Sequence, residues 1–503
     1  MLSLSDVLLL GTGVIAVYVL HQLVTHPLAA YPGPALAKFT NFWRLWTFTK
    51  GAQHLVDHDL HQKYGPIVRD GPNSLLVADI NVFKSIYGFN NALEKGDFYL
   101  SSSSKNPLDS NVFSARTEAQ HKEAKKKLVP PALSAKSLMQ YEAYVTRNVE
   151  KYGANLHKEI RNGKGKVDVT SGIERLTFDA MLEATYGTSM GFIDAGYDKN
   201  GTIADKGNIF FMSIAPGLVP WLARLFGSGP IEKLLRKPKL DKNGDPKGIT
   251  AAIIWSVAMV NAAVENTQSL QPSMLKSLLN VSTTDKRKPT LDFVRHECFN
   301  VVFAGTGSTA AALDAILYRI GSNLKWQSIV HDELQALPIY GSLSNGSLSE
   351  LPKLNALIKE TLRLHPPFEA PFERVVTNST NETVIPGLKG PLPAGTRLWS
   401  NAYIICRTPE VFGPDANEFR PERWLESPPE RLREMEDVYC VFGRGSRACI
   451  GKDLALMVMR KTVATVLHRW EISCPKGSLK GDNAFEMHYK SLPMSFTERS
   501  RTA

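Results

Sequence analysis

The chain has 503 residues, of which 43% are hydrophobic and 21% are charged. This composition excludes a disordered chain and supplies enough apolar surface for a large core. The formal net charge is +10, but the basic residues are scattered and no nucleic-acid-binding module surrounds them, which argues against a nucleic-acid partner. The five cysteines show no C-x-x-C spacing, which argues against a disulfide framework and a structural zinc site and fits a reducing compartment.

The first predicted element is an apolar helix near the start of the chain. Residues 7–20 carry no charge, and residues 4–24 are just long enough to cross a bilayer. A cleaved secretory signal is the alternative, but Asp6, and no lysine or arginine, precedes the apolar run. Basic residues follow the span, which places the rest of the chain on the cytosolic side. We therefore expect a single-pass membrane anchor over residues 1–26, a hinge at Pro32-Gly33-Pro34, and one large domain over residues 27–503.

Beyond residue 50, helical patterns dominate. Strand-like patterns are fewer, and the clearest cover residues 67–77 and 396–401, with weaker ones near 374–384 and at the C-terminal end. The predicted fold class is therefore mainly α with small β-sheets. Amphipathic helices are expected at residues 54–64, 117–127, 137–160, 250–265, 291–322, 325–336, 353–364 and 450–468.

The predicted helix over residues 291–322 contains the sequence FAGTGST at residues 303–309. Its two glycines, Gly305 and Gly307, cost about 2 kcal/mol of helix propensity, which predicts a local loosening of the helix. Residues 305–310 also match the dinucleotide fingerprint G-x-G-x-x-A, but no acidic residue follows about 20 positions later to bind a ribose. A nicotinamide- or flavin-binding fold is therefore disfavoured.

Three further motifs follow in the last third of the chain. Glu360 and Arg363 stand at i,i+3 spacing, which places them on one helix face. The sequences LHPP at residues 364–367 and FRPERW at residues 419–424 come next, and FGRGSRACIG occupies residues 442–451. In this last segment Gly443 and Gly445 permit a tight turn against a flat ligand. Cys449 lies near the expected start of a helix, where backbone N–H groups lower a thiol pKa and favour a metal-bound thiolate.

The order and spacing of these motifs resemble the cytochrome P450 family over roughly residues 27–500. Residues 442–451 fit the cysteine-ligand loop F-x-x-G-x-x-x-C-x-G at every defined position, and Glu360-x-x-Arg363 fits the family's E-x-x-R. The resemblance implies the cytochrome P450 fold and haem b, with Cys449 as the axial ligand of the haem iron. The anchor and loop style are similar to those of microsomal fungal secondary-metabolite members. That similarity implies an endoplasmic reticulum membrane protein whose catalytic domain faces the cytosol.

The resemblance also implies roles for individual residues. Glu360, Arg363 and Arg423 would form a buried ion-paired triad that braces the ligand loop. FAGTGST resembles the oxygen-binding helix, in which Gly305, Ser308 and Thr309 are the catalytic positions. Ser308 stands where the family usually has threonine, and Gly307 stands where it usually has an acid, which puts the proton route in doubt. The implied cofactor-binding residues are His121, Lys125, Arg374, Phe442, Arg447, Cys449 and Gly451. Among these cofactor-binding residues, Lys125 stands at a usual arginine position, so a bidentate contact with a carboxylate is lost there.

The implied substrate pocket is largely apolar. Residues 209–226 are too hydrophobic for a plain surface loop and are expected to dip toward the bilayer as a substrate gate. The pocket residues implied by position are Val301, Val302, Ala304, Phe368, Phe372 and Leu492.

The implied reaction is oxidation, such as hydroxylation, of a hydrophobic small molecule with O2. Electrons would come from NADPH through an NADPH-cytochrome P450 reductase, with cytochrome b5 as a further donor, because the chain shows no flavin or iron–sulfur module. An acidic donor surface would dock on Arg444, Lys452, Arg460 and Lys461, and membrane lipid is the other expected partner. Two alternatives stay open: an oxygen-independent isomerase or dehydratase, motivated by Gly307, and a haem-binding protein without turnover.

Overall fold

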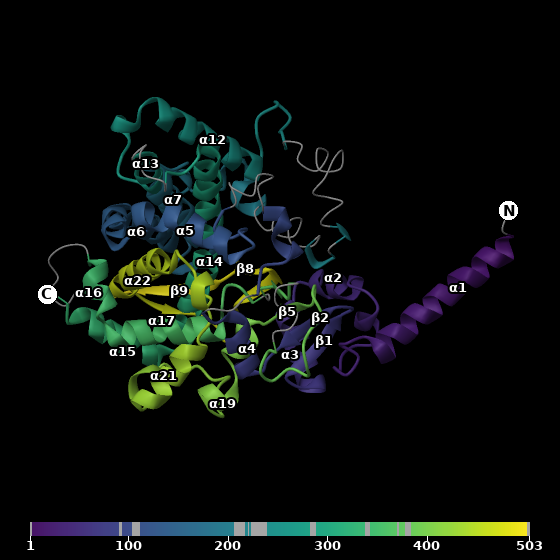
Figure 1. Cartoon of the computed structure of the whole chain (residues 1–503). Coiled ribbons are helices and arrows are strands. Elements are labelled where there is room, and N and C mark those ends of the chain that lie inside the picture. Colours follow the sequence, from purple (N-terminus) through teal and green to yellow (C-terminus); the bar gives the residue numbers. More distant parts are fainter. Residues whose placement is uncertain are drawn as a thin grey trace.

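A computed structural model describes residues 3–89, 93–102, 111–205, 217–219, 221–222, 239–281, 288–337, 343–369, 372–377 and 384–499. Helices dominate this structure, and short strands gather beside them (Figure 1). The predicted fold class, mainly helical with small sheets, is therefore confirmed. Most of the hydrophobic segment 209–226 lies outside the described residues, so its predicted role as a gate stays a prediction.

The predicted amphipathic helices are present with small changes at their ends, and the structure adds α7, which the pattern missed. Nearly every residue of α7 is buried, so its sequence has no polar stripe to reveal a helical period. The α-helices are α1 (Leu4–Leu20), α2 (Phe42–Phe48), α3 (Gln53–Tyr64), α4 (Ile80–Tyr87), α5 (Glu118–Ala132), α6 (Ala135–Asn162), α7 (Thr170–Tyr186), α8 (Phe192–Ala195), α12 (Ile249–Glu265), α13 (Met274–Leu279), α14 (Leu291–Gly321), α15 (Leu324–Gln335), α16 (Asn345–Ser349), α17 (Pro352–Leu364), α18 (Ala402–Ile405), α19 (Pro409–Phe412), α20 (Arg423–Glu426), α21 (Pro429–Val438) and α22 (Lys452–Arg469).

Helix α1 projects away from the body of the molecule (Figure 1). Together with the π-helical turn His21–Thr25 it forms a segment of 22 residues that is long and apolar enough to span a membrane and is almost entirely exposed. At its base, the Arg69 guanidinium donates to the backbone oxygen of Gln22 at 2.8 Å and also to its side-chain amide oxygen. These contacts fix the direction in which the candidate anchor leaves the body.

Within the described residues, the strands form three small sheets. The strand predicted over residues 67–77 is a hairpin, because Pro72 and Asn73 turn the chain between β1 and β2. In the first sheet β1 (Ile67–Gly71), β2 (Ser74–Val77), β5 (Arg397–Trp399) and β4 (Arg374–Val375) lie in that order, with β2 and β5 parallel. The second sheet has the order β3 (Lys166–Asp168), β9 (Pro493–Glu498) and β6 (Trp470–Ser473), and β7 (Lys480–Ala484) pairs with β8 (Glu486–Ser491).

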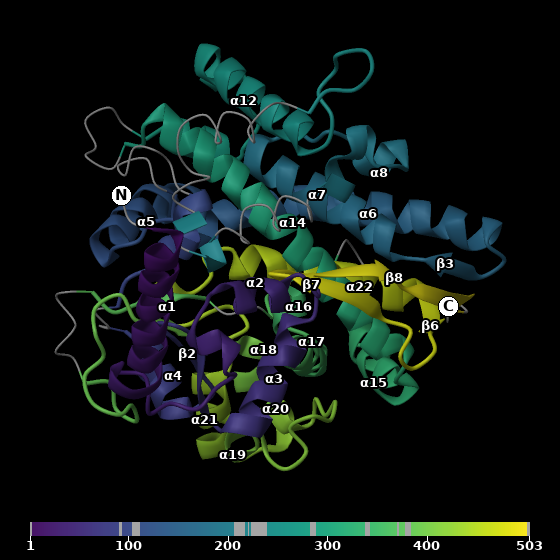
Figure 2. The same ribbon diagram turned by 90° about the vertical axis from the view of Figure 1, so that its right-hand side faces the viewer.

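Helix α14 runs through the middle of the molecule (Figure 2), where it packs against α7, α22, α17 and β8. It is continuous from Leu291 to Gly321, so the loosening predicted from Gly305 and Gly307 is not observed. Gly305 has a packing reason instead. A Cβ atom there would lie 2.8 Å from the Met181 sulfur, so the glycine lets α7 approach α14 closely.

Candidate active site

A cavity of about 350 Å³ lies between α14 and the loop at residues 440–451, and its surface is mostly apolar. The α14 wall carries Val301, Ala304, Gly305, Ser308 and Thr309. The structure places most of the predicted site residues around this one cavity, although they come from distant parts of the sequence. Besides those five, the predicted residues that line it are His121, Phe368, Phe372, Arg374, Phe442, Arg447, Cys449 and Gly451.

The loop that carries Cys449 is held by backbone geometry. Gly443 and Gly445 have φ angles of 72° and 65°, in the left-handed region that favours glycine. A Cβ atom at Gly445 would also lie 2.6 Å from the Tyr87 carbonyl oxygen. The N–H of Cys449 donates to the Phe442 carbonyl at 2.7 Å and closes the loop. The sulfur of Cys449 thus has a fixed position at the cavity wall.

The charge on this sulfur depends on two opposing effects. Removal from bulk water raises the pKa of the Cys449 thiol, whereas hydrogen bonds from the backbone N–H groups of Gly451 and Lys452 lower it. The backbone N–H groups at the start of α22 thus lower this pKa as the sequence predicts, but burial outweighs them and the net direction is upward. A bound metal cation would therefore be needed to hold the sulfur as a stable thiolate.

One edge of the cavity is strongly basic. Arg374, Arg447 and His121 line it together with Lys95, a residue that the sequence analysis missed. Burial and the charges of Arg374 and Arg447 hold the pKa of Lys95 well below its usual range. Burial and neighbouring cations also lower the pKa of His121, whose Nδ1 atom has no hydrogen-bond partner within the described residues. These groups repel one another and would be stabilised by an anionic ligand.

The cavity fits the haem implied by the family resemblance. It offers a sulfur ligand on one wall, mostly apolar sides, and a cationic edge for the two propionate groups. Lys95 carries no sequence signal for this role, because a single lysine before Asp97-Phe98-Tyr99 is indistinguishable from a surface residue. Only the fold shows that its amine is buried against the Tyr99 and Phe113 rings.

Replacing Lys95 with methionine is expected to weaken haem binding roughly tenfold, because one charged hydrogen-bond donor for a propionate is lost. The measurement is transfer of haem from the purified protein to an acceptor such as apomyoglobin. The matched control is Lys122→Met, at an exposed lysine on α5. Equal transfer rates for the two variants would contradict the assignment of Lys95 to the propionate edge.

Three predicted residues lie elsewhere. The Lys125 amine donates to the Ser446 carbonyl at 3.1 Å, so it supports the ligand loop from outside the cavity. Val302 points to another face of α14, where it lines a separate small cavity with Phe178. Leu492 is fully buried in the core, and the turn between β7 and β8 brings Phe485 to the cavity in its place. Phe485 has a φ angle of 82°, a conformation that the sequence pattern did not reveal.

Ser308 and Thr309 bring hydroxyl groups to the α14 wall. The Ser308 hydroxyl donates to the Ala304 carbonyl one turn earlier, at 2.6 Å, which leaves its lone pairs able to accept a proton. Thr309 is completely buried, and its hydroxyl has no hydrogen-bond partner in the described part of the chain. These two hydroxyls are therefore the groups on this wall that can hold or pass protons.

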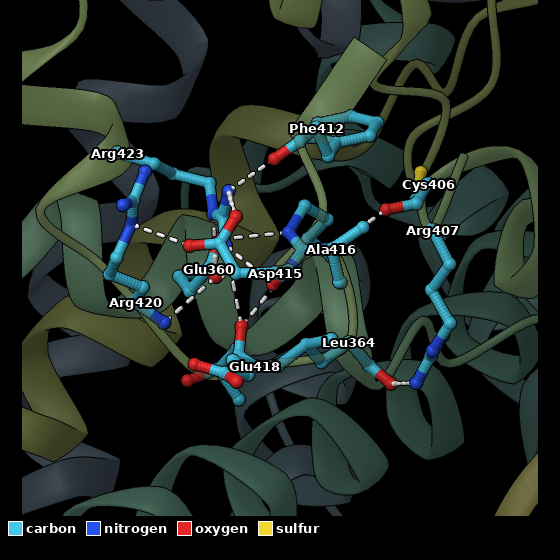
Figure 3. Close-up of polar contacts among 12 residues, drawn as sticks. Glu360, Leu364, Cys406, Arg407, Phe412, Asp415, Ala416, Glu418, Arg420 and Arg423 are labelled. Atoms are coloured by element: carbon cyan, nitrogen blue, oxygen red, sulfur yellow. Dashed lines mark hydrogen bonds and ion pairs between the residues drawn. The ribbon is translucent and has the colours of Figure 1, made fainter. Parts of the chain in front are cut away.

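The predicted triad forms one buried network that joins Glu360 and Arg363 of α17 to Arg423, and Figure 3 labels Glu360 and Arg423 within it. Both oxygens of Glu360 accept from the Arg363 guanidinium at 2.9 Å, and one also accepts from Arg423 Nε at 2.9 Å. The Trp424 indole N–H donates to Glu360 at 2.9 Å, and its ring packs against Tyr439 just before the ligand loop. The described hydrogen bonds of the triad reach residues 406–424, and none of them goes to residues 442–451. Any support that the triad gives the ligand loop would therefore act through packing, such as that of Trp424 on Tyr439.

Fewer of the four cations predicted to dock an electron donor are accessible than the sequence suggests. Lys461 is buried and pairs with Glu142 at 2.8 Å, so it cannot contact a partner. Arg444 pairs with Asp437 at 2.6 Å, and Arg460 donates to the Asn355 side chain at 2.7 Å. Among the four predicted cations, only Lys452 is fully exposed.

The sequence of this chain is similar to those of known proteins. Residues 32–492 match the family model described as Cytochrome P450. A cytochrome P450 monooxygenase of Aspergillus terreus is 30% identical over 465 residues, which cover 89% of this chain and 90% of that protein. The cytochrome P450 monooxygenase cicH of Emericella nidulans is 30% identical over 456 residues, 88% of each chain. The cytochrome P450 monooxygenase mpaDE of Penicillium roqueforti is 29% identical over 93% of this chain, which spans 55% of that protein's length.

Proposed function

This chain belongs to the cytochrome P450 family, and from that premise we propose that it is a haem-dependent monooxygenase that oxidises a hydrophobic small molecule, a natural-product intermediate. The observation that carries the proposal is the Cys449 thiol facing an apolar cavity of about 350 Å³ whose opposite wall bears two hydroxyls. The relatives named as monooxygenases come from filamentous fungi, which supports a place in fungal secondary metabolism.

Each group around the cavity has a separate task. Bound haem would supply the chemistry of dioxygen activation, which an axial thiolate favours. Cys449 would hold the metal, and Lys95, Arg374, Arg447 and His121 would bind the propionates. Phe368, Phe372 and Phe485 exclude water and orient an apolar substrate. Ser308 and Thr309 pass protons at their hydroxyl oxygens.

The proposal extends to partner and location. Residues 1–26 would anchor the protein in the endoplasmic reticulum membrane, and residues 27–503 would form the catalytic domain on the cytosolic side, in contact with lipid through α1. NADPH-cytochrome P450 reductase, with cytochrome b5 as a further donor, would supply electrons. The exposed Lys452 next to the ligand loop supports docking of an acidic partner on this side.

The test is turnover of candidate apolar compounds, first selected by the shift they cause in the Soret absorption of the haem. We expect product only when NADPH, reductase and O2 are all present, and with 18O2 we expect one labelled oxygen atom per product. Product that forms equally without O2 and reductase would contradict the monooxygenase and favour an isomerase or dehydratase. A haem-loaded protein that yields no product with any bound compound would instead favour a binding protein.

A further inference from the structure

A second, smaller cavity, here called the rear cavity, lies on another face of α14, and its mostly apolar lining includes a few buried polar side chains. Its volume is about 40 Å³, and Thr306, Gly307, Ala310, Ala311 and Asp314 line it along one face of α14. Thr177 of α7 and Glu486 of β8 close the other sides, in the region where β8 lies beside α14 (Figure 2). A buried water needs about 10–15 Å³ of such space, so the cavity has room for about three waters among these polar side chains.

Gly307 connects this cavity with the position where the family usually has an acid. Because Gly307 has no side chain, it borders this cavity where a family member with an acid would place a carboxylate. Asp314 lies seven residues further along the same face, about 10 Å along the helix axis. The rear cavity therefore brings carboxyl groups to the back of the helix turn that carries Ser308 and Thr309.

Asp314 is suited to store a proton. Its side chain is fully buried, and Thr170 donates to it at 3.2 Å. Burial raises the pKa of Asp314 well above its usual range, and the negative charge of Glu174 raises it further. The titratable groups that face Asp314 or its cavity are Tyr152, Asp168, Glu174, Glu486, His488 and Tyr489, and none of them carries a positive charge except His488 when protonated.

The far end of the cavity reaches solvent. His488 lies 3.7 Å from Glu174, and the His488 side chain is 54% exposed. This pair at the cavity mouth can take protons from bulk water and hand them inward.

The near end reaches the active-site wall through two threonines. Thr306 lines the rear cavity and donates its hydroxyl proton to the Phe303 carbonyl at 3.3 Å, so its oxygen can accept from a cavity water. Thr309 stands at i,i+3 to Thr306, where Cβ atoms are about 5–6 Å apart, and it lines the front cavity. Its buried hydroxyl has no hydrogen-bond partner within the described residues.

We propose that the rear cavity is the proton route of this enzyme, with Asp314 and Glu486 replacing the acid that Gly307 lacks. The proposal rests on the monooxygenase function proposed above. The Asp314 O–H bond breaks as its proton moves to a cavity water held by Glu486. That water gives a proton to Thr306 Oγ as the Thr306 hydroxyl turns from the Phe303 carbonyl and gives its own proton to Thr309 Oγ. Thr309 in turn releases its hydroxyl proton into the front cavity, where the reduction of O2 consumes it. The Asp314 carboxylate regains a proton from solvent through the His488–Glu174 pair, and no electron moves.

The first test measures the protonation of the Asp314 carboxyl directly, without turnover. Infrared spectra of the purified protein should contain a protonated-carboxyl absorption that shifts in D2O and is absent from Asp314→Asn. Because asparagine keeps an oxygen for the Thr170 hydrogen bond, this variant should fold. An unchanged spectrum in Asp314→Asn would show that this carboxyl is ionised, which would overturn the proposal.

The second test uses substrate-free oxidation of NADPH by the haem-loaded enzyme with purified reductase and O2. Glu486→Gln and Asp314→Asn should each slow oxidation roughly tenfold or more and raise its solvent deuterium isotope effect. The control is Glu471→Gln, at an exposed glutamate on β6, which should leave both quantities unchanged. Adding Gly307→Asp to Glu486→Gln should restore the rate, because it returns an acid to the family's position.

The outcomes separate this inference from the proposed function. A wild-type enzyme that consumes NADPH, together with unchanged rates and isotope effects in both variants, would overturn the proton route alone. A wild-type protein that binds haem but never consumes NADPH would contradict the monooxygenase, and the infrared result would then decide by itself whether Asp314 stores a proton.

Discussion

Replacing Cys449 with serine is expected to lower product formation by at least about a thousandfold, which corresponds to roughly 4 kcal/mol of lost transition-state stabilisation. Serine keeps the size of the side chain, but its hydroxyl is a far weaker anionic donor to iron than a thiolate. The reduced protein treated with carbon monoxide should also lose the absorption that is typical of thiolate ligation. The loop itself should persist, because the bond from the Cys449 N–H to Phe442 does not involve the sulfur.

The matched control is Cys474→Ser. Cys474 lies outside the large cavity and donates weakly to the Tyr318 carbonyl at 3.5 Å, a contact that serine can keep. This variant should show the wild-type spectrum and activity. If Cys449→Ser kept the thiolate spectrum as well, the ligand assignment and the function built on it would be wrong.

Glu360→Gln is expected to destabilise the protein by about 3–5 kcal/mol, because it leaves Arg363 as a buried charge without a counter-charge and Arg423 paired with Asp415 alone. Both arginine side chains are essentially inaccessible to solvent, so water cannot replace the carboxylate. The measurement is the urea midpoint of unfolding, followed by tryptophan fluorescence and by release of haem. Glu350→Gln, at an exposed position before α17, should shift the midpoint very little.

The pH dependence of the same network has a defined sign. Burial alone would raise the pKa of Glu360, but its hydrogen bond and ion pairs with Arg363 and Arg423 more than offset this, and the net pKa is lowered. The stability from Glu360 is therefore complete above the ordinary glutamate pKa of about 4.3 and is lost as pH falls through the lower folded value. The difference in stability between wild type and Glu360→Gln should shrink in acid. A constant difference down to low pH would contradict the ion-paired network.

Much of the site follows from local sequence. The loop at residues 442–451 contains its ligand and its turn glycines in one continuous stretch, so spacing alone identifies Cys449. Glu360 and Arg363 are one helical turn apart, and the helix period brings them together without any tertiary information. The family match over residues 32–492 confirms the resemblance that these motifs indicated.

The errors share a different origin. Val302 lies next to Val301, which lines the large cavity, and only the rotation of α14 decides which of the two faces it. Leu492 lies seven residues after Phe485, and only the course of the chain through β8 decides that Phe485 faces the cavity. Phe485 could not be found from sequence, because it packs against Phe368 and Phe372, which lie more than 100 residues earlier. Lys95 could not be found either, because the cations beside it, Arg374 and Arg447, follow more than 270 residues later. Helix α7 was missed because burial on all sides removes the amphipathic period.

The sequence by itself determined the family, the candidate sulfur ligand, the Glu360–Arg363 pair and the candidate membrane anchor, because each is encoded in short motifs of residues close together along the chain. The tertiary structure alone decided the cationic edge with Lys95, the aromatic wall with Phe485, and the small cavity that Gly307 shares with Asp314 and Glu486. These features join separate helices and strands, and their electrostatics depend on burial, which a one-dimensional pattern does not contain.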